Sequence, residues 1–362
     1  MKKREKGLIF LTITIILLCL LFSMKVKKGL NCLSFDEMIL RKVSMDDECL
    51  VDYIRKIKLF NPSTLPYNFT SRTGIYNIHF VKQSPFQSLK KDRDAPWIEA
   101  LIAVETFVPK IGQRVFLECG ALDGVTFSTT LHLERYLNWT GLLIEADARF
   151  YNDMKFVHRK AYGVHACASL YNHPSYALFK PSPIFFPVNK NGRNITGINP
   201  GNGGIKHGLR ASDIEDSGDL LQIQCIPLYS LLLAVSLMKI DLFILDTEGV
   251  EFEILKTIPF EKVEIAVLMI EVYGKPEIER QKIHDFLYVE GYSFYQTFKG
   301  GMHPGDDIFI KEKYFKNSEY QVKSSKPSLR DIYRIITGQK DEDIDESDLE
   351  TLISLSLPVL DV

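Results

Sequence analysis

The chain has 362 residues, of which 46% are hydrophobic and 25% charged, as is usual for a globular protein with a substantial core. Its formal net charge is −2, and beyond the first 24 residues 40 basic residues face 45 acidic ones, a balance of −5. No dense basic stretch occurs. A nucleic acid is therefore excluded as the main ligand, because phosphate binding needs clustered positive charge.

The N-terminus combines a basic segment with an apolar run. Residues 7–24 (GLIFLTITIILLCLLFSM) carry no charge and would span about 27 Å as a helix, enough to cross a bilayer. No small-x-small cleavage site follows, which favours an uncleaved signal anchor over a cleaved signal peptide. We expect residues 1–6 to form a cytoplasmic tail and 7–24 a transmembrane anchor, although the flanking charges do not decide the orientation.

Glycosylation sequons and cysteines favour a lumenal body. Asn68, Asn138 and Asn194 each begin an Asn-x-Thr acceptor. Five cysteines follow the apolar run, which fits one or two disulfides and a leftover thiol, and no Cys-x-x-Cys spacing suggests zinc. Cys32 with Cys49, and Cys167 with Cys225, are candidate pairs; the alternative is buried thiols, since spacing does not give connectivity.

The first half of the body begins with a stem. Residues 25–112 are expected to form a lumenal stem and lead-in, with helical spacing over 48–60. The main domain is expected over 113–315. Its first elements are three short apolar strands and two intervening helices, expected at 114–119, 126–137, 141–146, 147–158 and 164–169.

In the second half, residues 189–208 are rich in Gly and Asn, which predicts a binding loop, a lid or a disordered insertion. Strands are expected at 222–228, 241–246 and 264–273, each followed by a helix. Residues 292–298 and 307–310 predict a hairpin, and 316–362 a C-terminal extension with an acidic tail. Alternating strands and helices predict an α/β doubly wound sheet, and the hairpin an antiparallel edge.

The first strand ends in a glycine turn that could approach a ligand. Gly120 and Gly124 lie in this turn, and Glu145 follows the next strand, where a carboxylate can bind the two hydroxyls of a ribose. Asp147 is the rival for that role, with a helix N-cap as its alternative. The turn lacks G-x-G-x-x-G, which disfavours a pyrophosphate and favours S-adenosylmethionine (SAM).

Five segments carry a resemblance to a known family. They are FLECGALDGVTFSTTLHLERYLNWTGLLIEADARFY, HRKAYGVHACAS, QIQCIPLYSLL, DLFILDTEGVEFEILKTIPF and IAVLMIEVYG. Over residues 83–312 the chain resembles FkbM-type methyltransferase domains, and more narrowly their secretory-pathway branch that includes the insect Star protein. The resemblance implies a class I SAM-methyltransferase fold.

The resemblance also implies roles for single residues. It places Glu118, Gly120 and Asp123 at the methionine end of SAM, Glu145 at the ribose, and Ala166 and Cys167 near the adenine. Asp246 and Glu248 would lie at the reacting end. The chain departs from the family turn D-I-G-A-N-I-G at Glu118, Cys119, Leu122 and Asp123, which puts its SAM affinity in doubt.

Methyl transfer to a hydroxyl needs a base, and carboxylates supply candidates. Asp246 is the first candidate and Glu248 the second; the alternative is that both only hold the fold. The segment from Asp246 to Glu251 supplies three carboxylates, which could instead hold a divalent cation. Glu271 could orient an acceptor or be a buried structural acid. His165, His207 and His303 are weaker candidates for proton transfer than for surface or packing roles.

Two functions follow from this reading. The first is a membrane-anchored SAM-dependent methyltransferase that O-methylates a hydroxyl acceptor such as a glycan in the secretory lumen. The second, implied by the Star-like resemblance, is a non-catalytic escort of secreted or membrane cargo in the endoplasmic reticulum, Golgi and endosomes. Both expect a single-pass type II membrane protein with a lumenal body and no nucleic-acid partner.

Overall fold

The computed structural model describes residues 32–70, 96–181, 184–185, 197–198, 204–205, 220–300, 303–315 and 345. The expected anchor at residues 7–24, the sequon at Asn194, His207 and most of the segment 189–208 lie outside these ranges. Within the described ranges, no helix is both long and apolar enough to cross a membrane.

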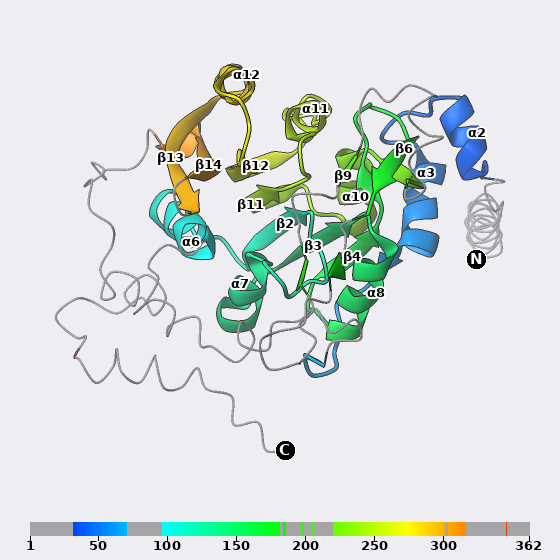
Figure 1. The fold of residues 1–362 in the computed structure, drawn as a ribbon, viewed down its shortest axis with the longest axis horizontal. Helices are drawn as coiled ribbons and strands as arrows, with labels where there is room; N and C mark the ends of the chain where they lie inside the picture. Colours follow the sequence, from blue (N-terminus) through cyan, green and yellow to red (C-terminus); the bar gives the residue numbers. More distant parts are fainter. Residues whose placement is uncertain are drawn as a thin grey trace, which may run out of the picture.

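The centre of the molecule is an eight-stranded sheet in the order β1-β4-β3-β2-β11-β12-β14-β13 (Figure 1). Its strands are β1 Leu59–Phe60, β2 Val115–Cys119, β3 Thr140–Glu145, β4 Tyr162–His165, β11 Lys239–Leu245, β12 Glu264–Glu271, β13 Tyr292–Gly300 and β14 His303–Lys311. Strands β4, β3, β2, β11 and β12 run parallel, as a doubly wound sheet requires. The predicted hairpin is antiparallel, and its second strand, β14, lies between β12 and β13.

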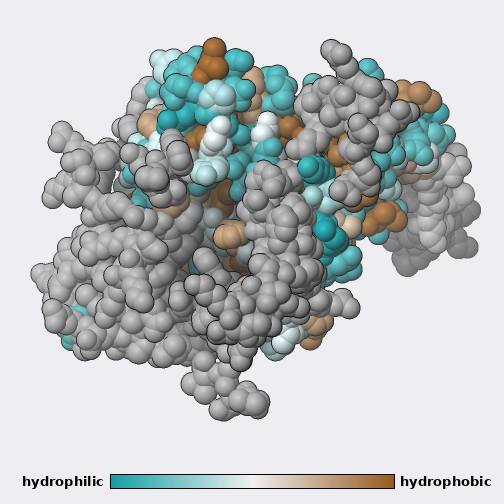
Figure 2. All heavy atoms as spheres, viewed as in Figure 1, coloured by the Kyte–Doolittle hydropathy of each residue, from teal (hydrophilic) through white to brown (hydrophobic). Residues whose placement is uncertain are grey.

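Helices cover both faces of this sheet (Figure 1). They are α2 Phe35–Leu40, α3 Glu48–Tyr53, α6 Pro96–Phe107, α7 Thr130–Leu137, α8 Ala148–Val157, α10 Leu228–Val235, α11 Glu251–Leu255, α12 Glu277–Val289 and α13 Glu312–Phe315. Because strand side chains alternate, Leu117 faces the core shared with α3, α10, α11 and α12, whereas Phe116 faces the core shared with α6, α7 and α8. Figure 2 shows mainly hydrophilic residues on the described surface around α12, with isolated hydrophobic ones.

A smaller sheet lies beside the large one, in the order β5-β10-β6-β9. It consists of β5 Cys167–Ala168, β10 Leu221–Ile226, β6 Ser175–Lys180 and β9 Gly204–Ile205, and the pair β7 Ile184–Phe185 and β8 Gly197–Ile198 forms a separate ribbon. The strand predicted at 164–169 is therefore divided: β4 belongs to the large sheet, and β5 pairs in parallel with β10.

The region expected as a stem packs onto the domain. Helix α3 continues into a π-helical turn, η1 Ile54–Lys58, and then into β1, which pairs antiparallel with β4. Met38, Leu50 and Ile54 are fully buried, and burying each such side chain contributes about 1.5–3 kcal/mol. Helix α6 likewise lies in the second core. The expected boundary at residue 113 thus falls inside one packed unit.

Candidate functional site

The chain order of the strands reverses between β2 and β11, the point where ligands bind in open α/β sheets. A cavity of about 500 Å³ lies there, at the carboxyl ends of the parallel strands. Its lining includes most of the predicted site residues, namely Glu118, Gly120, Glu145, Ala166, Cys167, Asp246, Glu248 and Glu271. Of the predicted SAM-binding and catalytic residues, Asp123 is absent from it.

Gly120 begins the turn after β2, where this turn lies against the end of β11. Its φ is 93°, a conformation that favours glycine, and a Cβ at this position would overlap the carbonyl oxygen of Asp246. The amide of Asp246 donates to the carbonyl of Cys119 at 3.0 Å. Glycine is therefore required here so that the turn after β2 can lie against the end of β11.

The two acids of the glycine turn have structural partners. Glu118 accepts hydrogen bonds from Ser128 Oγ (2.9 Å), the Thr129 amide (3.1 Å) and Thr130 Oγ1. Asp123 is completely buried and accepts from the amides of Val125 (2.9 Å) and Thr126 (2.7 Å).

These bonds correct two expectations. Asp123, expected at the methionine end of SAM, lies outside the cavity lining, because its carboxylate holds the turn. The helix expected from residue 126 begins only at Thr130, because residues 123–129 form the turn that these two carboxylates stabilise.

Glu145 lies at the end of β3 with its carboxylate in the cavity wall. It accepts from the amides of Leu122 and Asp147, both at 2.7 Å, and burial raises its pKa to about 7. Asp147 caps helix α8 through the Arg149 amide (2.9 Å) and pairs with the Arg149 guanidinium at 2.5 Å. Asp147 therefore has the capping role, and the ribose role expected of Glu145 stays a prediction.

An apolar wall continues from Glu145 toward the smaller sheet. Ile144, Phe150, Ala166 and Cys167 line this part of the cavity, which suits a flat, weakly polar group such as an adenine. A disulfide joins Cys167 to Cys225 on the neighbouring strand β10, and a second joins Cys32 to Cys49.

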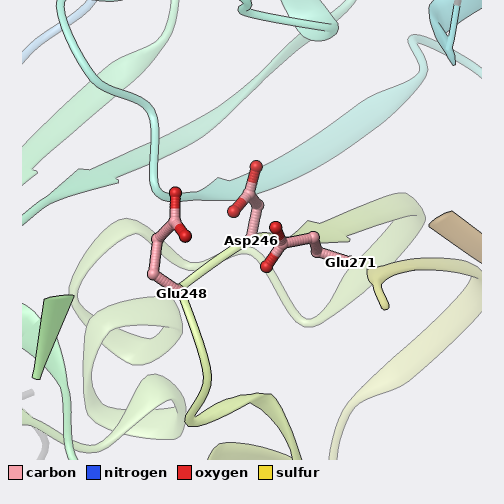
Figure 3. A group of neighbouring side chains, drawn as sticks. All are labelled: Asp246, Glu248 and Glu271. Carbon is pink, nitrogen blue, oxygen red and sulfur yellow. The ribbon is translucent and has the colours of Figure 1, made fainter. Parts of the chain in front are cut away.

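A group of carboxylates lies at the other end of the cavity. Oxygens of Asp246, Glu248 and Glu271 lie within 4.8 Å of one another (Figure 3). The first two residues belong to the loop directly after β11, and the third ends β12. Asp306, on β14, pairs in register with Glu271 and lines the same cavity. Carboxylates at this spacing can share a proton or hold a divalent cation, and we assign no ion.

Burial and mutual repulsion raise the pKa values of this group. The Asp246 side chain faces the cavity, through which solvent reaches it, and protein surrounds it there. This burial raises the pKa of Asp246 well above its usual value, and the neighbouring carboxylate of Glu271 is the next largest cause. Burial, then Glu251 and Glu248, raise the pKa of Glu271 to about 8, and burial, then Asp307, raise that of Asp306 to about 7. Near neutral pH the group therefore contains both proton acceptors and proton donors.

The charged side chains in the described lining of the cavity are all acidic. Among the described residues that form it there are seven carboxylates and no Lys, Arg or His. A cavity of this kind attracts cations and repels phosphates. Of the histidines proposed from the sequence, His165 stacks on Tyr151 outside the lining, and the side chain of His303 lies outside the described residues.

Several residues of the site were not predicted correctly from the sequence. Asp306 was missed, although its position could have been inferred. Strand β14 runs antiparallel to β12, so the first residues of β14 lie at the edge of the sheet where β12 ends. Phe127 and Tyr273 line the cavity and are 62% and 58% exposed. Glu251, counted from the sequence among the carboxylates of the site, is buried and holds the loop after β11.

Residues 118–294 match the model of the methyltransferase FkbM domain. Over these residues, just under half of its length, the chain is similar to FkbM methyltransferase domains. The match supports the predicted SAM-dependent methyltransferase. It extends from the end of β2 to the start of β13 and includes all the carboxylates of the cavity except Asp306.

Solved structures show weak likeness. A methyltransferase from Pyrococcus furiosus shares 16% identity at a TM-score of 0.31, covering 59% of this chain and 82% of the other. TYW2 from M. jannaschii, solved with AdoMet, shares 13% at 0.27, covering 59% and 75%. The delta-N METTL16 methyltransferase domain shares 12% at 0.31, covering 62% and 91%. No curated protein matches the chain.

Proposed function

We propose that the FkbM domain transfers a methyl group from SAM to a hydroxyl acceptor. The observation that carries the proposal is the charge of the cavity: its described lining is rich in carboxylates and has no basic side chain. SAM, when bound, supplies an electrophilic methyl group on a positively charged sulfonium. Electrostatic attraction favours such a ligand over a phosphate-bearing nucleotide.

The two ends of the cavity suit the two reactants. Glu145 would accept hydrogen bonds from the ribose hydroxyls, and the wall of Ile144, Phe150 and Ala166 would contact the adenine. The acceptor would then lie against Asp246 and Glu271. This arrangement orients the acceptor oxygen toward the methyl group, and orientation supplies a large part of the rate enhancement in bimolecular reactions.

Asp246 is the base in this proposal, with Glu248 as the second candidate. Its raised pKa makes it a stronger proton acceptor than an ordinary aspartate, as general base catalysis near neutral pH requires. Glu271, with a pKa of about 8, carries a proton at neutral pH and can donate a hydrogen bond to the acceptor. The acceptor's proton would pass to the carboxylate of Asp246 as the oxygen is methylated.

Calorimetric titration of the full-length protein with SAM tests this function. We expect SAM to bind more tightly than S-adenosylhomocysteine, which lacks the sulfonium charge. Glu145→Gln should weaken SAM binding at least about tenfold, because a hydrogen bond to a charged group contributes about 1.5–3 kcal/mol. Glu105 pairs with Arg114 away from the cavity, so the control variant Glu105→Gln should bind SAM as wild type does. Equal affinity of Glu145→Gln and wild type would refute the ribose assignment.

We further propose that the acceptor is a glycan or similar hydroxyl compound in the secretory lumen, and that residues 7–24 anchor the protein there. The two disulfides support an oxidising compartment, because cytosolic thiols are kept reduced. The sequons at Asn68 and Asn138 support the same location.

A non-catalytic, Star-like escort of secreted or membrane cargo is the second candidate. One observation favours it: Glu118 and Asp123, which the family resemblance places at the methionine end, make hydrogen bonds within their own turn. The same titration separates the candidates. Absence of heat with sub-millimolar SAM would leave the escort as the better proposal.

A further inference from the structure

The loop that carries Asp246 and Glu248 is held by one buried carboxylate. Glu251, the first residue of α11, is 1% exposed. Its Oε1 accepts from the Thr247 amide at 2.9 Å, the Thr247 hydroxyl at 3.1 Å and the Gly249 amide at 3.1 Å. These bonds fix the backbone on both sides of Glu248, whose φ of 60° is unfavourable for a residue with a side chain.

The second oxygen of Glu251 reaches a different part of the chain. Lys275 Nζ, whose side chain is 10% exposed, donates to Oε2 at 2.6 Å. Lys275 belongs to the connection between β12 and α12, four residues after Glu271. The Glu251–Lys275 bridge therefore joins the loop that carries Asp246 and Glu248 to the segment that carries Glu271 and Tyr273.

We propose that Glu251 is a positioning residue for methyl transfer, which it serves by fixing the 246–249 loop and by locking it, through Lys275, to the strand end that carries Glu271. The inference rests on the proposed function. Glu251 lies outside the cavity lining and touches no reactant in this scheme. It acts by holding the carboxylates at the separation that lets them share a proton.

The bridge also sets the charge around the site. Asp246 faces the carboxylates of Glu271, Glu248, Asp306 and Glu251, and each raises its pKa. Around Glu271, the carboxylates of Glu251, Glu248 and Asp306 raise the pKa and Lys275 lowers it. Removing the charge of Glu251 should lower both pKa values, whereas removing that of Lys275 should raise that of Glu271.

Two neutralising variants of the full-length protein test the proposal by pH profile. In Glu251→Gln the amide oxygen can still accept the loop's hydrogen bonds, so activity should persist and the acid limb of kcat/KM should move to lower pH. Lys275→Met should instead move the alkaline limb, which the proton donor Glu271 sets, to higher pH. The matched controls are Glu253→Gln and Lys256→Met, which neutralise an exposed pair on and just after the same helix and should leave the profile unchanged.

Glu251→Ala removes the bonds to the loop as well as the charge. We expect kcat to fall about 10²-fold, the effect of a small misplacement of reacting groups, while SAM affinity stays near that of wild type. Amide hydrogen exchange gives a readout that needs no activity. The amides of Thr247 and Gly249 should exchange slowly in wild type and Glu251→Gln, and fast in Glu251→Ala.

The outcomes separate the two proposals. If wild type neither binds SAM nor transfers methyl groups, the proposed function fails and the exchange measurement still tests the bridge. Equal exchange of the two amides in wild type and Glu251→Ala would overturn the positioning role. Unchanged pH profiles in Glu251→Gln and Lys275→Met would overturn it too, because a merely structural bridge lowers stability without shifting the profile in opposite directions.

Discussion

Glu271 shows at the residue scale how the site lowers the stability of its own fold. Its pKa rises from the ordinary 4.5 to about 8 on folding, because burial and the neighbouring Glu251 and Glu248 disfavour its ionised form. A carboxyl group whose pKa rises on folding contributes stability that is full below pH 4.5 and is lost as the pH rises through about 8. The ligand-free protein is therefore weakened at alkaline pH by a group to which the proposed reaction assigns a role.

This argument predicts a pH-dependent gain of stability in Glu271→Gln. The variant should be more stable than wild type at pH 9 by at least about 1 kcal/mol, and equal to it near pH 4.5, as measured by urea unfolding at both pH values. Glu264→Gln at the opposite end of β12 is the control: hydrogen bonds from Tyr314 and Lys313 lower the pKa of Glu264, so that variant should instead lose stability at pH 9. A Glu271→Gln protein no more stable at pH 9 would contradict the raised pKa.

Single residues also show what the sequence could and could not predict. Glu145, Asp246 and Glu248 were found because carboxylates that follow parallel strands meet at one edge of the sheet. Glu118 and Asp123 occupy the same edge but turn toward hydroxyls and amides of their own loop. The positions of the strands follow from the hydrophobic pattern of the sequence. The direction of a side chain at a strand end depends on hydrogen bonds in the loop, which that pattern does not encode.

At the scale of elements, the parallel strands were predictable because each is a continuous apolar run covered on both faces. Strand β1 was not predictable, because it has only two residues and forms by pairing with β4, about a hundred residues later in the chain. Helix α6 has apolar residues on every side, so it lacks the amphipathic period that marks a surface helix. Both missed elements depend on contacts distant in sequence.

The disulfide between Cys167 and Cys225 links β5, which lines the cavity, to β10. We predict that Cys225→Ser destabilises the protein by about 2–4 kcal/mol, the usual effect of losing a native disulfide. It should also weaken SAM binding, because β5 loses its covalent tie to the strand beside it. Chemical unfolding and calorimetry measure the two effects.

Cys49→Ser is the matched control for that prediction. It removes the Cys32–Cys49 disulfide, whose residues do not line the cavity. This variant should lose stability and keep the SAM affinity of wild type. If both variants bind SAM as wild type does, β5 keeps its place without the disulfide, and the apolar wall of the cavity does not depend on that bond.

At the scale of the whole molecule, the proposed lumenal location accounts for the disulfides and the sequons and limits which acceptors are available. Thr70 donates its amide and hydroxyl to Asn68 Oδ1 at 3.1 and 2.6 Å, and Asn138 is exposed where α7 ends. A folded body in the secretory lumen would present both asparagines on its described surface. The location also decides which acceptors the cavity can meet.

We predict that the protein made in a secretory cell carries N-linked glycans at Asn68 and Asn138. Digestion with a glycan-cleaving amidase should lower its mass on a gel, and Thr70→Ala or Thr140→Ala should each remove one glycan. Thr70→Ser and Thr140→Ser keep the acceptor sequence and serve as controls for the substitutions themselves. An undigested band of unchanged mass in wild type would place the body on the cytosolic side, where neither disulfide would persist and a lumenal glycan could not be the acceptor.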